Sequence, residues 1–203
     1  MWRLARLMKN PVDMLDAAER LERTRELGRV VRAKVAMAAA SPEAPEALLF
    51  VNLHSSDLND EELYLADAPL SRLAKRVVLE ITERASLYGV QDMAARLKKL
   101  RGMGFRLAID DLGAGYAGLT SFTMLEPEIA KLDMSLVRGV DKDSKRQSII
   151  RSMKTLCDEL KILVVSEGIE TPGERDMLAE LGCDLFQGYL FARPERGFPT
   201  PKW

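Results

Sequence analysis

From residue 48 onward, short apolar and β-branched runs alternate with amphipathic or charged segments, and this alternation constrains the fold more than any other feature. Strands that alternate with helices are typical of an α/β protein in which helices cover a parallel sheet. Helices are predicted over residues 149–160, where apolar residues recur at helical spacing, over residues 91–99, and over residues 10–35, where Asn10 and Pro11 form a typical helix start. The predicted strands are Leu48–Leu53, Val77–Thr82, Phe105–Asp111, Ile129–Met134, Leu163–Gly168 and Asp184–Phe191. Such a set fits either an open sheet or an incomplete eight-stranded barrel.

The composition is that of one globular domain. The chain has 203 residues, with 30 Lys+Arg, 31 Asp+Glu and a formal net charge of −1. Because nucleic acids and anionic membranes attract basic proteins, this balance argues against a nucleic acid polymer or a membrane as the partner. The N-terminus lacks a signal-peptide core and no apolar run approaches the roughly 20 residues of a membrane span, so a cytoplasmic protein is expected. Cys157 and Cys183 are interpreted as core residues and His54 as a loop histidine, which excludes disulfide scaffolds and histidine-rich metal cages.

Polar residues occur late in almost every predicted strand. In parallel α/β proteins the carboxyl ends of the strands meet on one face, where active sites form. A carboxylate inside a buried run also needs a partner, because burying an unpaired charge is costly. The residues concerned are Asn52, Glu80 with Glu83 just beyond it, Asp110, Asp111, Lys131, Asp133, Glu167 and Gln187. Their convergence on one rim predicts a functional site.

The residue types at this rim limit the chemistry. Asn52, Glu80, Asp110 and Asp111 offer hard oxygen ligands, which favour Mg²⁺ or Mn²⁺ over zinc or copper. Adjacent aspartates repel each other unless a cation lies between them, and a shared carboxylate is a natural bridge for two metals. Two-metal sites activate water for displacement at phosphorus, so phosphoester hydrolysis is the predicted chemistry. Lys131 would orient the water or neutralise charge on the phosphate, and Glu167 would act as ligand or general base.

Each of these residues also has a purely structural interpretation. Asp110 and Asp111 would cap a following helix, and Lys131 would be the buried partner of Asp133. Residues 187–188 would form a strand bulge. Two glutamates, Glu83 and Glu170, would be capping or surface residues. The functional interpretation therefore depends on the convergence of the set.

A second motif favours a different function. Residues 113–118 match G-x-G-x-x-G directly after a strand, and Asp133 falls near the offset of the ribose-binding acid in dinucleotide-binding folds. The fingerprint usually follows the first strand of its fold, whereas two predicted strands precede it here. Asp110 and Asp111 would also place two negative charges beside a pyrophosphate. An active-site loop is the preferred interpretation of these glycines.

The polar motifs together resemble those of the EAL family of bacterial cyclic di-GMP phosphodiesterases, from about residue 10 to Pro194. The matching runs, in order, are residues 51–53 (VNL), 79–83 (LEITE), 110–116 (DDLGAGY), 131–133 (KLD), 166–170 (SEGIE) and 187–190 (QGYL). The resemblance implies a (β/α)₈ TIM-barrel-like fold that hydrolyses cyclic di-GMP to linear pGpG with Mg²⁺ or Mn²⁺, and a homodimer.

The resemblance also implies roles for individual residues. It assigns Asn52, Glu80, Asp110 and Asp111 to the metals, and Lys131 and Glu167 to the catalytic water. Substrate-binding or loop-anchoring roles are implied for Glu83, Asp133 and Gln187. In the family the loop that begins at Asp111 links the metal site to the dimer interface, and Glu83 would anchor it.

The sequence departs from the family at its N-terminus. The glutamate of the family's Glu-Ala-Leu motif belongs at or upstream of Met1 and Trp2, where no glutamate occurs. The tripeptide at residues 46–48 has the same letters but precedes the strand that ends in Asn52, at the opposite end of the barrel. We therefore expect a single EAL-type domain over residues 1–203, incomplete at the N-terminus. Residues 1–9 would be a remnant of the missing region and residues 195–203 a C-terminal tail.

Two explanations of this departure lead to different functions. In one, the chain is a shortened form of an active phosphodiesterase whose natural form carries an upstream sensor or receiver domain. In the other, it is a degenerate member that binds cyclic di-GMP as a sensor, or serves as a protein-interaction or dimerisation module. Retention of the other site residues favours the first.

Overall fold

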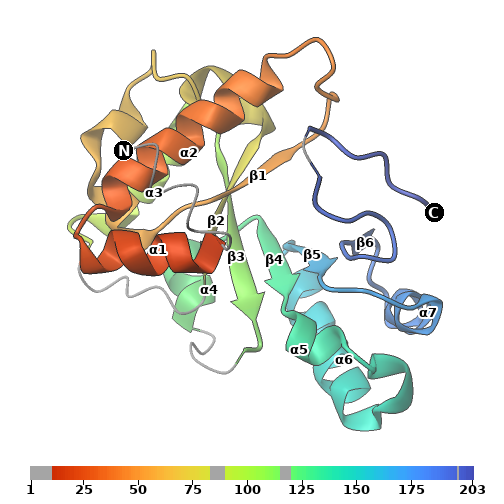
Figure 1. Ribbon diagram of the computed structural model, residues 1–203. Coiled ribbons are helices and arrows are strands. Elements are labelled where there is room, and N and C mark those ends of the chain that lie inside the picture. The colour runs from red at the N-terminus through yellow and green to blue at the C-terminus, as the bar shows by residue number, and fades with distance from the viewer. Residues whose placement is uncertain (1–10, 83–89, 115–119, 196) are drawn as a thin grey trace.

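A computed structural model describes residues 11–82, 90–114, 120–195 and 197–203. Its centre is a parallel sheet in which the six strands follow one another in chain order, from β1 to β6. Figure 1 shows helices α1 to α4 grouped around the first half of this sheet and α5 to α7 around the second half. The predicted α/β class is confirmed: the parallel strands form a half-barrel.

Each predicted strand is present, with most ends shifted by a few residues; the strand predicted over Asp184–Phe191 is reduced to the two residues Leu185–Phe186. The strands are β1 (Leu49–Asn52), β2 (Val77–Thr82), β3 (Arg106–Leu112), β4 (Ile129–Leu132), β5 (Leu163–Ser166) and β6 (Leu185–Phe186). The helices are α1 (Pro11–Arg20), α2 (Thr24–Ala39), α3 (Met93–Met103), α4 (Thr120–Leu125), α5 (Met134–Val137), α6 (Ser144–Glu159) and α7 (Pro172–Glu180). Short 3₁₀ helices η1 (Ser55–Asn59), η2 (Glu61–Tyr64) and η3 (Ser71–Arg76) connect β1 to β2, and η5 (Val140–Lys142) precedes α6.

The two faces of the sheet have different surroundings, because alternate residues of a strand point to opposite faces. The outer face packs against helices in the main core, where Leu79 and Ile109 of the strands meet Leu100 and Ile150 of the helices. On the inner face, Val78, Ala108, Ile129 and Val165 form a second, smaller apolar cluster. In the strand register Glu80 is the neighbour of Ala108, and Lys131 is the neighbour of Val165. The polar residues of the inner face therefore lie next to this cluster, towards the carboxyl ends of the strands.

The helix predicted over residues 10–35 is wrong as a single element, because two helices occupy this region. Helix α1 ends at Arg20, and Glu22 takes a left-handed conformation with φ of 54°. The amide of Arg23 then donates to the carbonyl of Ala18 at 2.7 Å, a bond that closes the helix end. Helix α2 starts afresh at Thr24 and runs to Ala39, beyond the predicted end.

The other sequence-based assignments are mostly confirmed. Cys157 and Cys183 are both buried, and burial raises the pKa of the Cys157 thiol to about 11. His54 lies in the loop after β1, where its Nδ1 accepts a hydrogen bond from the amide of Ser56 at 3.1 Å. Within the described ranges, no helix is both long and apolar enough to cross a lipid bilayer.

Candidate active site

Lys131 on β4 is the centre of a buried group of charges at the carboxyl end of the sheet. Its Nζ lies 2.7 Å from Oε1 of Glu167, which follows β5, and 3.1 Å from Oδ1 of Asp110 on β3. It also forms an ion pair with Glu80 on β2. The side chains of Lys131 and Glu80 are each only 5% exposed. Four residues from four strands or strand ends therefore meet, as the sequence predicted from their positions.

Burial and charge compete in setting the protonation of this group. Burial would lower the pKa of Lys131, but the surrounding carboxylates outweigh burial and raise it above its ordinary value. Burial also raises the pKa of Glu167, to about 7, even though Lys131 opposes that change. The pKa of Glu80 is raised for the same reason, again against the effect of Lys131. One ammonium thus faces more carboxylates than it can neutralise.

A subset of these acids is arranged to hold a cation. Asp110, Asp111 and Glu167 each offer one carboxylate oxygen, and these three oxygens all lie within 4.8 Å of one another. Asp111 has φ of 59°, a left-handed conformation that is uncommon for residues other than glycine, although aspartate and asparagine adopt it more often than most. The donors are hard oxygens close to a surplus of negative charge, so the residues present fit Mg²⁺ or Mn²⁺.

Asn52 lies at the end of β1, beside this group. It is paired in register with Glu80, and the amide of the next residue, Leu53, donates to the carbonyl of Glu80 at 2.8 Å. The Asn52 side chain is exposed, on the same face of the sheet as Glu80 and Lys131. Nearby, the ring of Phe50 lies 5.9 Å from Lys131 Nζ. The geometry therefore leaves the Asn52 amide accessible at the rim of the acidic group.

A cavity of about 270 Å³ opens next to the acids. Its lining includes four residues singled out by the sequence, namely Asp111, Asp133, Glu167 and Gln187. The rest of its wall carries no predicted site role and consists of Met134, Arg138, Gly168, Gly188 and Tyr189, of which the last three belong to the runs that match the EAL family. Arg138 is held there by an ion pair with Glu170. Arg138 lies in no predicted strand, so the rule that selected the acids could not select it; Tyr189 lies late in a predicted strand but was not chosen as a site residue.

The structural alternatives for the acids and Lys131 are largely wrong. Asp110 and Asp111 both lie within β3, so they are strand residues and not helix caps; Asp110 Oδ1 accepts a hydrogen bond from the amide of Asp111 at 3.0 Å. Lys131 is buried as that alternative required, but its partners are the three carboxylates and not Asp133. The Asp133 side chain caps α5, accepting from the amide of Ser135 at 2.9 Å.

The remaining positions have separate outcomes. Glu170 is an exposed residue paired with Arg138, as its surface interpretation required. Glu83, and the last glycines of the G-x-G-x-x-G match, lie outside the described residues. The tripeptide at 46–48 precedes β1, at the end of the strand opposite Asn52, as expected.

Comparison with known proteins supports the resemblance to the EAL family that the sequence motifs indicate. The family model described as the EAL domain matches residues 2–194. The blue light- and temperature-regulated antirepressor BluF of Escherichia coli is 29% identical over 178 residues, 78% of this chain and 44% of BluF. The cyclic di-GMP phosphodiesterase RocR of Pseudomonas aeruginosa is 39% identical over 118 residues, 58% of this chain and 30% of RocR.

A solved structure extends the similarity to three dimensions. The complex of Klebsiella pneumoniae BlrP1 with manganese and cyclic di-GMP superimposes with a TM-score of 0.81 at 34% identity, covering 91% of this chain and 48% of BlrP1. The chain thus spans less than half the length of each of these three relatives. With a family model that matches nearly its whole length, the chain belongs to the EAL domain family.

Proposed function

We propose that this chain is a metal-dependent phosphodiesterase domain that hydrolyses cyclic di-GMP to linear pGpG. The observation that carries the proposal is the meeting of Glu80, Asp110 and Glu167 around Lys131, with Asp111 beside them. RocR is named a cyclic di-GMP phosphodiesterase, and the BlrP1 complex contains cyclic di-GMP and manganese. Both relatives support the choice of substrate and of a divalent cation.

Four side chains would hold Mg²⁺ or Mn²⁺: Asn52, Glu80, Asp110 and Asp111. When bound, a divalent cation lowers the pKa of a water molecule and neutralises charge on a phosphodiester. Asp110 lies between β2 and β4 in the sheet order and contacts Lys131, which makes it the most central of the four.

Glu167 and Lys131 would manage the proton and the charge of the reaction. Burial raises the pKa of Glu167 to about 7 in the metal-free protein, and its carboxylate would accept the proton of the attacking water. The water oxygen would bond to phosphorus while the ribose 3′ oxygen leaves and takes up a proton, so that the water's atoms end on the phosphate and on the 3′ hydroxyl; Lys131 would donate hydrogen bonds to the oxygen that gains charge. Lys131 also holds the Glu167 carboxylate in place at 2.7 Å.

Three further residues would act on the substrate or the surrounding loops. Gln187 and Asp133 line the cavity beside the acids and would contact the nucleotide there. Glu83 would anchor the loop that starts at Asp111. The homodimer and the upstream sensor or receiver domain stay predictions for the natural protein.

A second candidate function is binding of cyclic di-GMP without hydrolysis. The similarity to BluF, which is named a blue light- and temperature-regulated antirepressor, favours a regulatory role. The two functions share the site and differ only in turnover.

Incubation of the purified chain with cyclic di-GMP and Mn²⁺, followed by chromatography for pGpG, separates them. The expected result is pGpG from the wild type and none from Asp110→Asn, with both proteins folded by circular dichroism. Binding of cyclic di-GMP with no product from the wild type would establish the sensor function. Product formed equally by Asp110→Asn would contradict the assigned site.

A further inference from the structure

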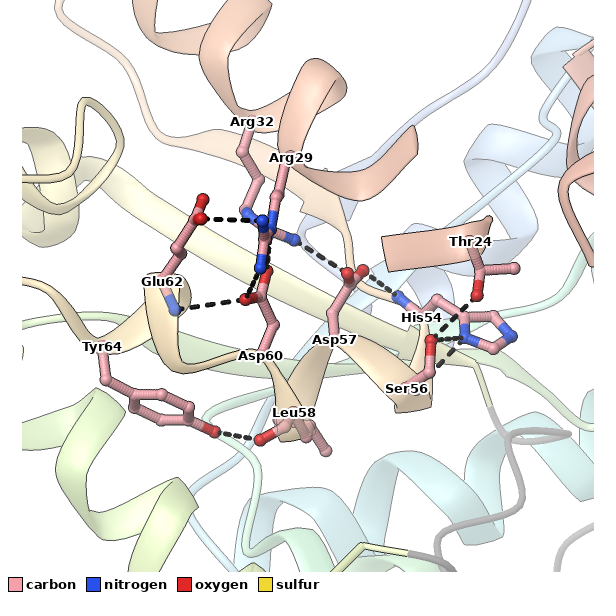
Figure 2. Close-up of polar contacts among 10 residues, drawn as sticks. All are labelled: Thr24, Arg29, Arg32, His54, Ser56, Asp57, Leu58, Asp60, Glu62 and Tyr64. Atoms are coloured by element: carbon pink, nitrogen blue, oxygen red, sulfur yellow. Dashed lines mark hydrogen bonds and ion pairs between the residues drawn. The ribbon is translucent and has the colours of Figure 1, made fainter. Parts of the chain in front are cut away.

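A second group of buried charges lies between α2 and the segment that follows β1. Arg32 of α2 is 7% exposed, and Asp57 and Asp60 are each 1% exposed. Arg32 Nη1 lies 3.0 Å from Asp57 Oδ1, and Arg32 Nη2 lies 2.7 Å from Asp60 Oδ2 (Figure 2). Arg29, one turn earlier, forms a second pair with Asp60 at 2.7 Å. Charges buried this deeply are costly unless each is paired, and here two arginines face two aspartates, so the group holds α2 firmly against the segment that follows β1.

Asp57 connects this group to the strand that carries Asn52. The amide of His54 donates to Asp57 Oδ2 at 3.2 Å, as Figure 2 shows. The amide of Leu53 is bound to the carbonyl of Glu80. Both backbone amides that follow Asn52 are therefore hydrogen-bonded: that of Leu53 to β2, and that of His54 to Asp57.

Gly28 brings α2 into direct contact with the same carboxylate. A Cβ atom at this position would lie 2.4 Å from Asp57 Oδ1, closer than nonbonded atoms approach. Gly28 and Arg32 lie one turn apart on α2. The helix backbone at Gly28 packs closely against the Asp57 carboxylate, and Arg32 forms an ion pair with it. Through Asp57, the position of α2 therefore determines the path of the backbone directly after β1.

We propose that Asp57, held by Gly28 and Arg32, is a positioning residue that fixes the backbone after Asn52 and so aims the Asn52 amide at the metal. Asp57 would itself touch neither metal nor substrate. The inference rests on the proposed function, in which Asn52 is a metal ligand. Outer partners that orient a ligand are worth about 10-fold to 100-fold in metal affinity.

The first arm of the test moves the Asp57 carboxylate without removing a charge. Gly28→Ala inserts a methyl group against Asp57, and Gly102→Ala makes the same change in α3, where a Cβ would meet nothing within 4 Å. Calorimetric titration of each protein with Mn²⁺ measures affinity, and thermal unfolding in EDTA measures the stability of the metal-free fold. Gly28→Ala should weaken Mn²⁺ binding about tenfold or more, and Gly102→Ala should leave it at the wild-type value.

The second arm compares two aspartates that share Arg32. Asp57→Ala and Asp60→Ala each remove one buried partner of Arg32, but only Asp57 binds the amide of His54; Asp60 Oδ1 instead accepts from the amide of Glu62 at 3.1 Å. Both variants should unfold at lower temperature, whereas only Asp57→Ala should weaken Mn²⁺ binding. Asp57→Asn, which keeps an oxygen for the His54 amide, should recover most of the affinity.

The possible results separate the inference from the proposed function. If the wild type itself binds no Mn²⁺, the proposed metal site is wrong and the inference falls with it. If the wild type binds Mn²⁺ and both aspartate variants lose affinity equally, or neither does, Asp57 is a structural residue only. The glycine variants and the aspartate variants disturb Asp57 in different ways. If a variant of one set does not fold, the other set still tests whether Asp57 positions Asn52.

Discussion

Lys131 Nζ lies 2.7 Å from Oε1 of Glu167 in a group where the same ammonium also pairs with Asp110 and Glu80. A single positive charge thus serves three carboxylates, with Asp111 as a fourth acid close by. Like charges held together in a site of low exposure repel strongly. A divalent cation would relieve that repulsion, so the excess of negative charge is itself an argument for metal binding.

Added metal should stabilise the folded protein through Asp110. A ligand that binds only the folded state raises the free energy of unfolding, by about 2.7 kcal/mol at 100 times its dissociation constant. For a chain of this size that corresponds to a rise of roughly 5–10 °C in melting temperature. Differential scanning fluorimetry with saturating Mn²⁺ should show this rise for the wild type and lose most of it for Asp110→Asn. Asp184→Asn, an exposed position before β6, is the matched control and should respond like the wild type.

Removing the central ammonium should destabilise the metal-free fold. Lys131→Met leaves Glu80 and Glu167 as buried charges without their cation, a change that typically costs about 3–5 kcal/mol. The loss should be greatest near pH 8 and smaller near pH 5, because protonation removes the uncompensated charge. Urea unfolding in EDTA at both pH values measures it. Lys98→Met on the exposed side of α3 should change the free energy of unfolding by no more than about 0.5 kcal/mol; an equally small effect of Lys131→Met would show that the carboxylates do not depend on Lys131.

Glu167 should make the metal-free protein less stable as pH rises. Its pKa is about 7 in the folded state against an ordinary value of 4.5, so between these pH values the folded protein binds more protons than the unfolded chain. Stability from this group is therefore complete below pH 4.5 and falls as pH increases to 7, by on the order of 3 kcal/mol. Unfolding free energies of wild type and Glu167→Gln, measured in EDTA from pH 4.5 to 8, give the contribution by subtraction. A difference that stays constant with pH would refute the assignment.

Glu174 should contribute stability with the opposite pH dependence. Burial acts to raise its pKa, but its carboxylate accepts hydrogen bonds from the amides of Gly139, Glu170 and Thr171, and these hold the pKa below the ordinary value. The stability it provides is present above the unfolded pKa and lost as pH falls through the folded pKa. Glu174→Gln should cost about 1.5–3 kcal/mol at pH 7, and less at pH 3. Glu180→Gln, on the exposed end of the same helix, is the control for chemical denaturation.

The strands and most of the site could be predicted because both depend on local patterns. Each strand is a short apolar run, and a polar residue at its end is brought to the common rim by the parallel arrangement alone. Glu80, Asp110, Lys131 and Glu167 were found in this way, and their contacts confirm that they meet.

The parts that sequence reasoning missed depend on partners far along the chain. Arg32 resembles the other arginines of a helix expected to face solvent, and only its buried partners in η1 and beyond, Asp57 and Asp60, distinguish it. The break between α1 and α2 occurs at Glu22, without the glycine or proline that usually marks one. Gly28, the position that looks more like a helix breaker, lies inside α2, where its missing side chain makes room for Asp57.

The strict order of the strands also has a consequence for folding. Each of β2 to β6 pairs with the strand that precedes it in the chain, so its partner has already been synthesised when it emerges from the ribosome. Among the described residues every strand pairing joins neighbours in the chain, so the loop that each pairing closes, and the entropy lost in closing it, is smaller than for a pairing between distant strands. The sheet can therefore grow one strand at a time from β1, and the acids of the rim come together in the order Glu80, Asp110, Lys131 and Glu167, so that the ammonium arrives after two of the carboxylates it must neutralise.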